Sequence, residues 1–184
     1  MRISLRRGAL GKAQPNKGRS MQLKSLGRLL IDELQEVYIS ETLIQEALGR
    51  LETGASAKEL KGAFEKHGEQ TGAQIARLET VFEKLEASPR GGHGYSMKAL
   101  LRETEDRMGD GGDAPVVDAS LIGAARRMVH WKIAAYGTTQ IYAERLQLGD
   151  VAKMLGQTLE EEIAADARLA ELAKQIDVLG NDEV

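Results

Sequence analysis

The segment from Leu121 to Leu146 constrains the fold of this chain most strongly, because its residue spacing is that of one long helix. Every third or fourth position forms a stripe made of Leu121, Ala125, Met128, Lys132, Ala135, Thr139, Tyr142 and Leu146. This period predicts a helix with one face against a core. Lys132 lies in the middle of that face, and a buried ammonium group needs a partner of opposite charge. The stripe therefore predicts neighbouring helices that bring carboxylates to the same depth.

Three further segments, at about 23–51, 57–85 and 151–179, have stripes of the same period and predict three more long helices. Polar residues interrupt these stripes near their middles: Glu41 in the first, His67, Thr71 and Gln74 in the second, and Glu162 in the third. Residues at the middle of packed helices share one depth in a bundle. We therefore expect a polar layer across the centre of the core.

The connection between the second and third long helices is much longer than a tight turn. It contains a loop at 88–94, a short amphipathic helix at about 96–108, and a glycine-rich break at 110–115 before the next helix begins near Val116. Such a crossover lets the third long helix run parallel to the second, as in ferritin-like bundles. The predicted fold is all-α: a ferritin-like antiparallel four-helix bundle with a short fifth helix in the crossover. Ser56 and Glu59 predict a capping box at the second helix.

Composition agrees with one helical domain. The 184 residues are 42% hydrophobic and only 4% aromatic, with three prolines and no cysteine. The absence of cysteine excludes disulfides, thiolate metal sites and a cysteine nucleophile. No apolar run approaches the roughly 20 residues that span a bilayer, so we expect no membrane insertion. We expect a basic extension at 1–20, the bundle at 21–180, and a short tail at 181–184.

The first 20 residues contain six basic side chains and no acidic one, whereas the whole chain carries a net charge of −3. We expect this stretch to be a disordered extension. Six cations without interleaved aromatic residues predict at most weak, salt-dependent attraction to nucleic acid. The stretch lacks the apolar region of a secretory signal, so we expect a cytoplasmic protein.

Two kinds of chemistry fit the predicted polar layer. Inward carboxylates and a histidine are the ligands of a dinuclear metal site in a bundle core, and iron or manganese suits such ligands. The candidate ligands are Glu41, His67, Glu162 and, one turn further, Asp166. In the alternative that we favour, Lys132 replaces the metal, and no cofactor is bound. The core polar network then consists of Glu41, Thr71, Gln74, Lys132 and Glu162.

The sequence resembles the YciF-like ferritin-like family of bacterial stress proteins from about Met21 to Ala173. The resemblance rests on Asp32 to Tyr38 with Glu41, Phe64 to His67 with Thr71, Gln74 and Arg77 to Glu79, Asp118 to Ala125, His130, Ile133 to Thr138, and Thr158 to Glu162 with Asp166. The family is similar to rubrerythrins and ferritins in fold. The resemblance implies a homodimer and a di-iron-type site, with Glu41, His67, Glu162 and Asp166 at matching ligand positions.

The chain departs from the family pattern where metal ligands are expected. The family reads Glu-His-Tyr-Glu where this chain has Val129 to Lys132, so both acids are missing there. The paired acids of the second helix are Glu69 and Gln70 here, and Gln157 replaces a family glutamate. These changes favour a stress-associated protein with a degenerate, metal-poor site. The alternative is a di-iron or di-manganese oxidoreductase, or an iron-handling protein, that uses the remaining ligands.

Overall fold

The structure is a computed structural model that describes residues 25–176. Those residues form five helices and no strand: α1 (Leu26–Gly54), α2 (Lys58–Lys84), α3 (Tyr95–Asp110), α4 (Ala114–Arg145) and α5 (Gly149–Gln175). The all-α prediction is confirmed, and each helix begins and ends within a few residues of its expected position. The predicted basic extension at 1–20 and the tail at 181–184 lie outside the described residues, as does most of the predicted last turn up to Leu179.

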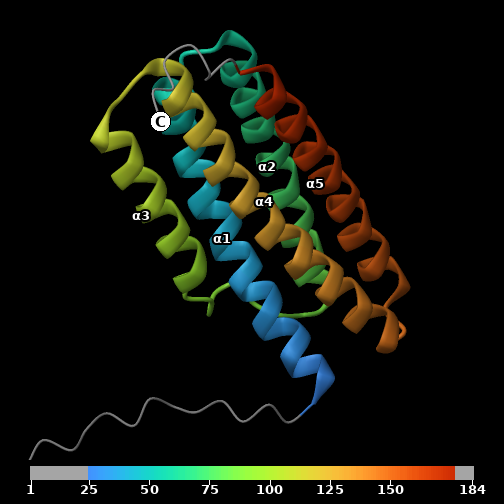
Figure 1. Ribbon diagram of the computed structural model, residues 1–184. Coiled ribbons are helices and arrows are strands. Elements are labelled where there is room, and N and C mark those ends of the chain that lie inside the picture. The colour runs from blue at the N-terminus through green and yellow to red at the C-terminus, as the bar shows by residue number, and fades with distance from the viewer. Residues whose placement is uncertain (1–24, 177–184) are drawn as a thin grey trace, which may run out of the picture.

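The four long helices form a bundle, and α3 packs on its outside against α1 and α4 (Figure 1). Within the bundle α1 borders α2 and α4, and α5 borders the same two helices. The end of α1 meets the start of α4, where the backbone at Ser56 bonds to Asp118. Thus α1 is antiparallel to both α2 and α4, so α2 and α4 run parallel. This is the crossover connectivity predicted from the sequence.

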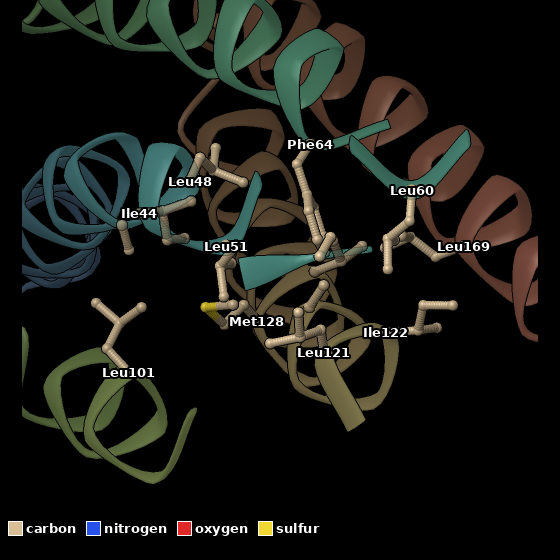
Figure 2. Packing of buried hydrophobic residues seen from close by; sticks show 14 of the residues in the cluster. Ile44, Leu48, Leu51, Leu60, Phe64, Leu101, Leu121, Ile122, Met128 and Leu169 are labelled. Carbon is tan, nitrogen blue, oxygen red and sulfur yellow. The ribbon is translucent and has the colours of Figure 1, made fainter. Parts of the chain in front are cut away.

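The apolar core consists of two clusters. One joins the end of α1 to the starts of α2 and α4, to the second half of α5 and to α3 (Figure 2). It includes Ile44, Leu48, Leu51, Leu60, Phe64, Leu101, Leu121, Ile122, Met128 and Leu169. The other includes Leu30, Leu34, Val37, Leu78, Val81, Phe82, Tyr136, Val151 and Leu155. In every bundle helix the predicted polar residues fall between these two clusters, so apolar packing closes the layer on both sides.

The predicted capping box at the start of α2 is wrong. Ala57 is the N-cap and makes no side-chain cap hydrogen bond. Instead the buried carboxylate of Asp118 on α4 accepts from the backbone N–H groups of Ser56 and Ala57, at 2.7 and 2.8 Å. A charged acceptor at a helix N-terminus satisfies free donors and favours the helix dipole. Asp118 therefore caps α2 and ties it to α4.

The loop before α3 is fixed to α1 by polar contacts. The Gln35 side chain donates to the carbonyls of Ser88 and Arg90, each at 2.8 Å. Close approach also requires glycine at position 92, where a Cβ would lie 2.2 Å from the Gln35 carbonyl oxygen. These contacts hold the beginning of the crossover against the bundle.

Candidate functional site

Lys132 on α4 is the centre of the polar layer and is fully buried. Its Nζ donates to Gln74 Oε1 at 2.8 Å and to Glu162 Oε1 at 2.9 Å. It also lies 2.8 Å from Glu41 Oε2, as an ion pair whose angle falls outside hydrogen-bond geometry. An ammonium group has three donor hydrogens. Oxygens from α1, α2 and α5 therefore surround the ammonium: two accept its hydrogen bonds, and the third, on Glu41, is an ion-pair partner.

Glu41 on α1 lies between two donors from α4. Its Oε2 faces Lys132, and its Oε1 accepts from the Tyr136 hydroxyl at 2.7 Å. The predicted polar layer did not include Tyr136. The available signal was its position four residues after Lys132, which places both side chains on one face of α4. Tyr136 thus completes the environment of the Glu41 carboxylate.

Glu162 on α5 directs its two oxygens to opposite sides. Its Oε1 accepts from Lys132 and, at 2.8 Å, from Gln74 Nε2. Its Oε2 lies 3.7 Å from His67 Nε2, which is too long for a hydrogen bond. The His67 side chain is 8% exposed, so it belongs to the edge of the buried layer.

A second set of charges, unforeseen from the sequence, connects the layer to the surface. Arg77 on α2 forms two hydrogen bonds with Glu161, at 2.8 and 3.0 Å, and also donates to the Thr158 hydroxyl. Gln74 Nε2 reaches Glu161 Oε2 at 3.1 Å. A bidentate arginine–carboxylate pair has strong geometric specificity. It fixes α2 to α5 about one turn from Gln74 on α2.

The pKa values follow from these contacts. Burial alone would lower the pKa of Lys132, but Glu41 and Glu162 together raise it above 10.5. Burial opposes charge on Glu162 as well, but Lys132 and His67 outweigh it and lower its pKa from 4.5 to about 2. Burial dominates at Glu41 and raises its pKa above 4.5 despite Lys132. Lys132 is therefore an ammonium group held by carboxylates that differ in proton affinity.

Two of the sequence-predicted site residues take other roles. Asp166 lies at the partly exposed surface, where both its oxygens accept from Arg126 at 2.8 and 3.2 Å. His130 lies 3.1 Å from the same carboxylate. Thr71 is fully buried, but its hydroxyl has no partner in the network that was predicted to include it. The structure brings together Glu41, Gln74, Lys132 and Glu162, with His67 beside them.

The residues of this layer do not fit a pair of iron or manganese ions. The Lys132 ammonium lies between the carboxylates of Glu41 and Glu162, where a dinuclear centre would need its cations. A protonated amine cannot ligate, and it repels a divalent cation a few ångströms away. Within residues 25–176 no group of three or more His, Cys, Asp or Glu side chains is arranged to hold a metal ion. The site is an internal ion-pair network.

Four antiparallel helices, a crossover that contains a short helix and a polar layer at mid-height define a protein of the ferritin-like class. The chain belongs to the family described as "Domain of unknown function (DUF892)", whose match covers residues 25–178. The resemblance stated from the sequence is thereby confirmed. None of the helices in the part described here is long and apolar enough to cross a membrane.

Two relatives extend along nearly the whole bundle. Protein YciF of Escherichia coli (strain K12) is 34% identical over 154 residues, which cover 83% of this chain and 93% of the relative. The crystal structure of the E. coli stress protein YciF gives a TM-score of 0.80 and covers 83% of this chain and 96% of that one. YcfI from Rhodopseudomonas palustris is 32% identical, with a TM-score of 0.79 and coverage of 82% and 96%.

Proposed function

We propose that this protein is a non-catalytic, ferritin-like member of a bacterial stress response, in which an internal ion pair takes the place of a metal centre. One observation carries the proposal. The ammonium of the fully buried Lys132 lies within 2.9 Å of Glu41, Gln74 and Glu162. The description of the relative YciF as a stress protein supports the biological setting.

The physical basis is the cost of burying carboxylates. Two ionised carboxylates that face each other in a core repel, and each loses its hydration, so the layer needs a cation. A metal pair supplies that cation in a dinuclear site, and Lys132 supplies it here. Tyr136 and Gln74 donate to the same carboxylates and reduce the cost further.

This exchange of cations determines the chemistry. An ammonium group changes no oxidation state and offers no open coordination position, so the layer supports no redox step. We infer that the bundle acts through its outer surfaces or its assembly, and that it does so in the cytoplasm.

The test is an anaerobic titration of the purified full chain with ferrous iron, followed by exposure to air. We expect no stoichiometric binding and no absorption band of oxidised iron. Binding of one or two equivalents with such a band would overturn the proposal. It would instead support the di-iron or di-manganese oxidoreductase, or the iron-handling protein, that the remaining ligands suggest.

We also propose that the protein forms a homodimer through the outer side of the seam between α4 and α5. Ile141 on α4 and Ile163 on α5 are 55% and 52% exposed, so each helix of the seam presents one large apolar side chain to solvent. Ile141 lies one helical turn after Gly137, and Ile163 lies one turn after Leu159. Gly137 and Leu159 pack in the seam, where a Cβ on Gly137 would lie 3.8 Å from the Leu159 side chain. A second copy would cover both isoleucines.

A further inference from the structure

Four polar atoms of the layer have no hydrogen-bond partner among the described residues: Glu41 Oε2, Thr71 Oγ1, His67 Nε2 and Glu162 Oε2. Glu41 Oε2 still has the Lys132 ammonium 2.8 Å away as an ion-pair partner, which leaves three atoms without either kind of contact to Lys132. Thr71 is 0%, Glu162 1% and His67 6% exposed, so bulk water does not satisfy them. Buried polar groups in folded proteins are nearly always hydrogen-bonded. Three unpartnered atoms in one layer therefore point to a bound molecule.

The Thr71 hydroxyl behaves differently from other helical threonines in this chain. Five of them donate to the backbone carbonyl four residues earlier: Thr42, Thr53, Thr80, Thr104 and Thr139. That bond is available to any threonine inside a helix. Thr71 lies inside α2 and does not make it. Its hydroxyl therefore lacks the bond that its own helix could offer.

The neighbouring groups cannot supply the missing partners. His67 Nε2 and Glu162 Oε2 lie 3.7 Å apart, beyond hydrogen-bond distance from each other. Lys132 Nζ already donates to Gln74 Oε1 and Glu162 Oε1, and it lies against Glu41 Oε2 as an ion pair. Thr71 is one turn from His67 on the buried face of α2, so the two side chains are neighbours on that face.

We propose that His67, Thr71 and Glu162 bind one internal water molecule. Water has two donors and two acceptors, and buried waters typically make about three hydrogen bonds. At about 2.8 Å from both His67 Nε2 and Glu162 Oε2, a water oxygen would lie roughly 2 Å off the line that joins them. A divalent cation is disfavoured because Lys132 is so close. This inference goes beyond the proposed function, since it concerns atoms that the lysine does not bond.

The experiment is a high-resolution crystal structure of the wild-type chain, with anomalous data at the iron and manganese edges, and thermal unfolding of Thr71→Val. The matched control is Thr139→Val. Thr139 is equally buried, but its hydroxyl bonds only to carbonyls of its own helix, at 2.9 and 3.1 Å. Both changes exchange a hydroxyl for a methyl group of similar size, so they differ in the bond that is lost.

We expect a density peak without anomalous signal within hydrogen-bond distance of the three atoms. We also expect Thr71→Val to remove that peak and to melt about 2–4 °C below Thr139→Val. Absence of the peak, with the Thr71 hydroxyl bonded to its own helix and equal melting of both variants, would overturn the inference. An anomalous peak at the same position would also overturn it. Of these outcomes, only the anomalous peak would also contradict the proposed function, because it would show a bound metal.

Discussion

Lys132 decides what the surrounding carboxylates can do. Its ammonium donates to Gln74 and Glu162 and forms an ion pair with Glu41, so each carboxylate has one oxygen against a cation already in the layer. A buried ion pair of this kind adds little net stability compared with a well-packed apolar core, but breaking it is costly. The main effect of the lysine is therefore to offset the free-energy cost of burying the carboxylates of Glu41 and Glu162.

Removal of the shared cation should destabilise the fold. We expect Lys132→Met to lower the free energy of unfolding by about 3–5 kcal/mol, because two buried carboxylates lose their partner. The double change Lys132→Met with Glu41→Gln should recover part of that loss. Urea unfolding measures both. Lys174→Met is the control, since Lys174 pairs with Glu171 at the exposed surface and should change little. A Lys132→Met chain as stable as the wild type would contradict the ion-pair account.

The pKa shifts predict a stability loss in acid that belongs to Glu162. Its pKa is about 2 in the folded chain against 4.5 when unperturbed, so its stabilisation is complete above pH 4.5 and is lost as pH falls toward 2. The raised pKa of Glu41 has the opposite sign: its contribution is complete below pH 4.5 and is lost as pH rises through the raised value.

We therefore expect Glu162→Gln to flatten the fall of unfolding free energy between pH 5 and 3, and Glu41→Gln not to flatten it. Urea unfolding at a series of pH values measures the slopes. If the free energy of unfolding falls with the same slope in wild type and in Glu162→Gln, this carboxylate is not the source of the stability loss in acid.

At the scale of elements, the helical period predicted every long helix and failed where partners are remote in sequence. The stripes locate the helix faces because each side chain repeats its direction every 3.6 residues. The start of α2 looked like a local capping box at Ser56. Its true cap is Asp118, which lies 62 residues further along the chain. No spacing rule connects residues so distant, so only the packed fold shows this contact.

The capping role of Asp118 predicts a clear difference between two substitutions. Asp118→Ala should lower the free energy of unfolding by about 1–2 kcal/mol, because two backbone donors lose a charged acceptor. Ser56→Ala should be nearly neutral, since only the backbone N–H of Ser56 takes part. If urea unfolding shows that both substitutions lower the free energy of unfolding equally, the Ser56 side chain caps the helix after all, and the role given to Asp118 is wrong.

At the scale of the whole molecule, the sequence indicated which residues share a depth but not how their atoms pair. Glu41, Lys132 and Glu162 lie at the middles of packed helices, so their meeting could be expected from the stripes. The Tyr136 bond to Glu41 and the Arg77 pair with Glu161 depend on helix rotation, which periodicity defines only to within a residue. For the same reason the stripe could place Asp166 only at the edge of its face, as a candidate ligand, and could not show its pairing with Arg126 at the partly exposed surface.

The proposed dimer gives a prediction at the same scale. Ile163→Glu should shift the chain from dimer to monomer in light scattering coupled to size exclusion, because a charge would be buried at the seam between α4 and α5. The matched control is Val116→Glu, at an exposed apolar side chain near the start of α4. It should leave the dimer intact. Loss of the dimer in the control alone would place the interface elsewhere.

Elemental analysis of the purified wild type and of Lys132→Glu, both expressed with added iron and manganese, tests the replacement of metal by lysine most directly. We expect no stoichiometric metal in the wild type. The variant should hold metal, because the substitution removes the cation and adds a carboxylate beside Glu41, His67 and Glu162. Stoichiometric metal in the wild type would contradict the account. So would a folded variant without metal, because the lysine would then not be what keeps metal out.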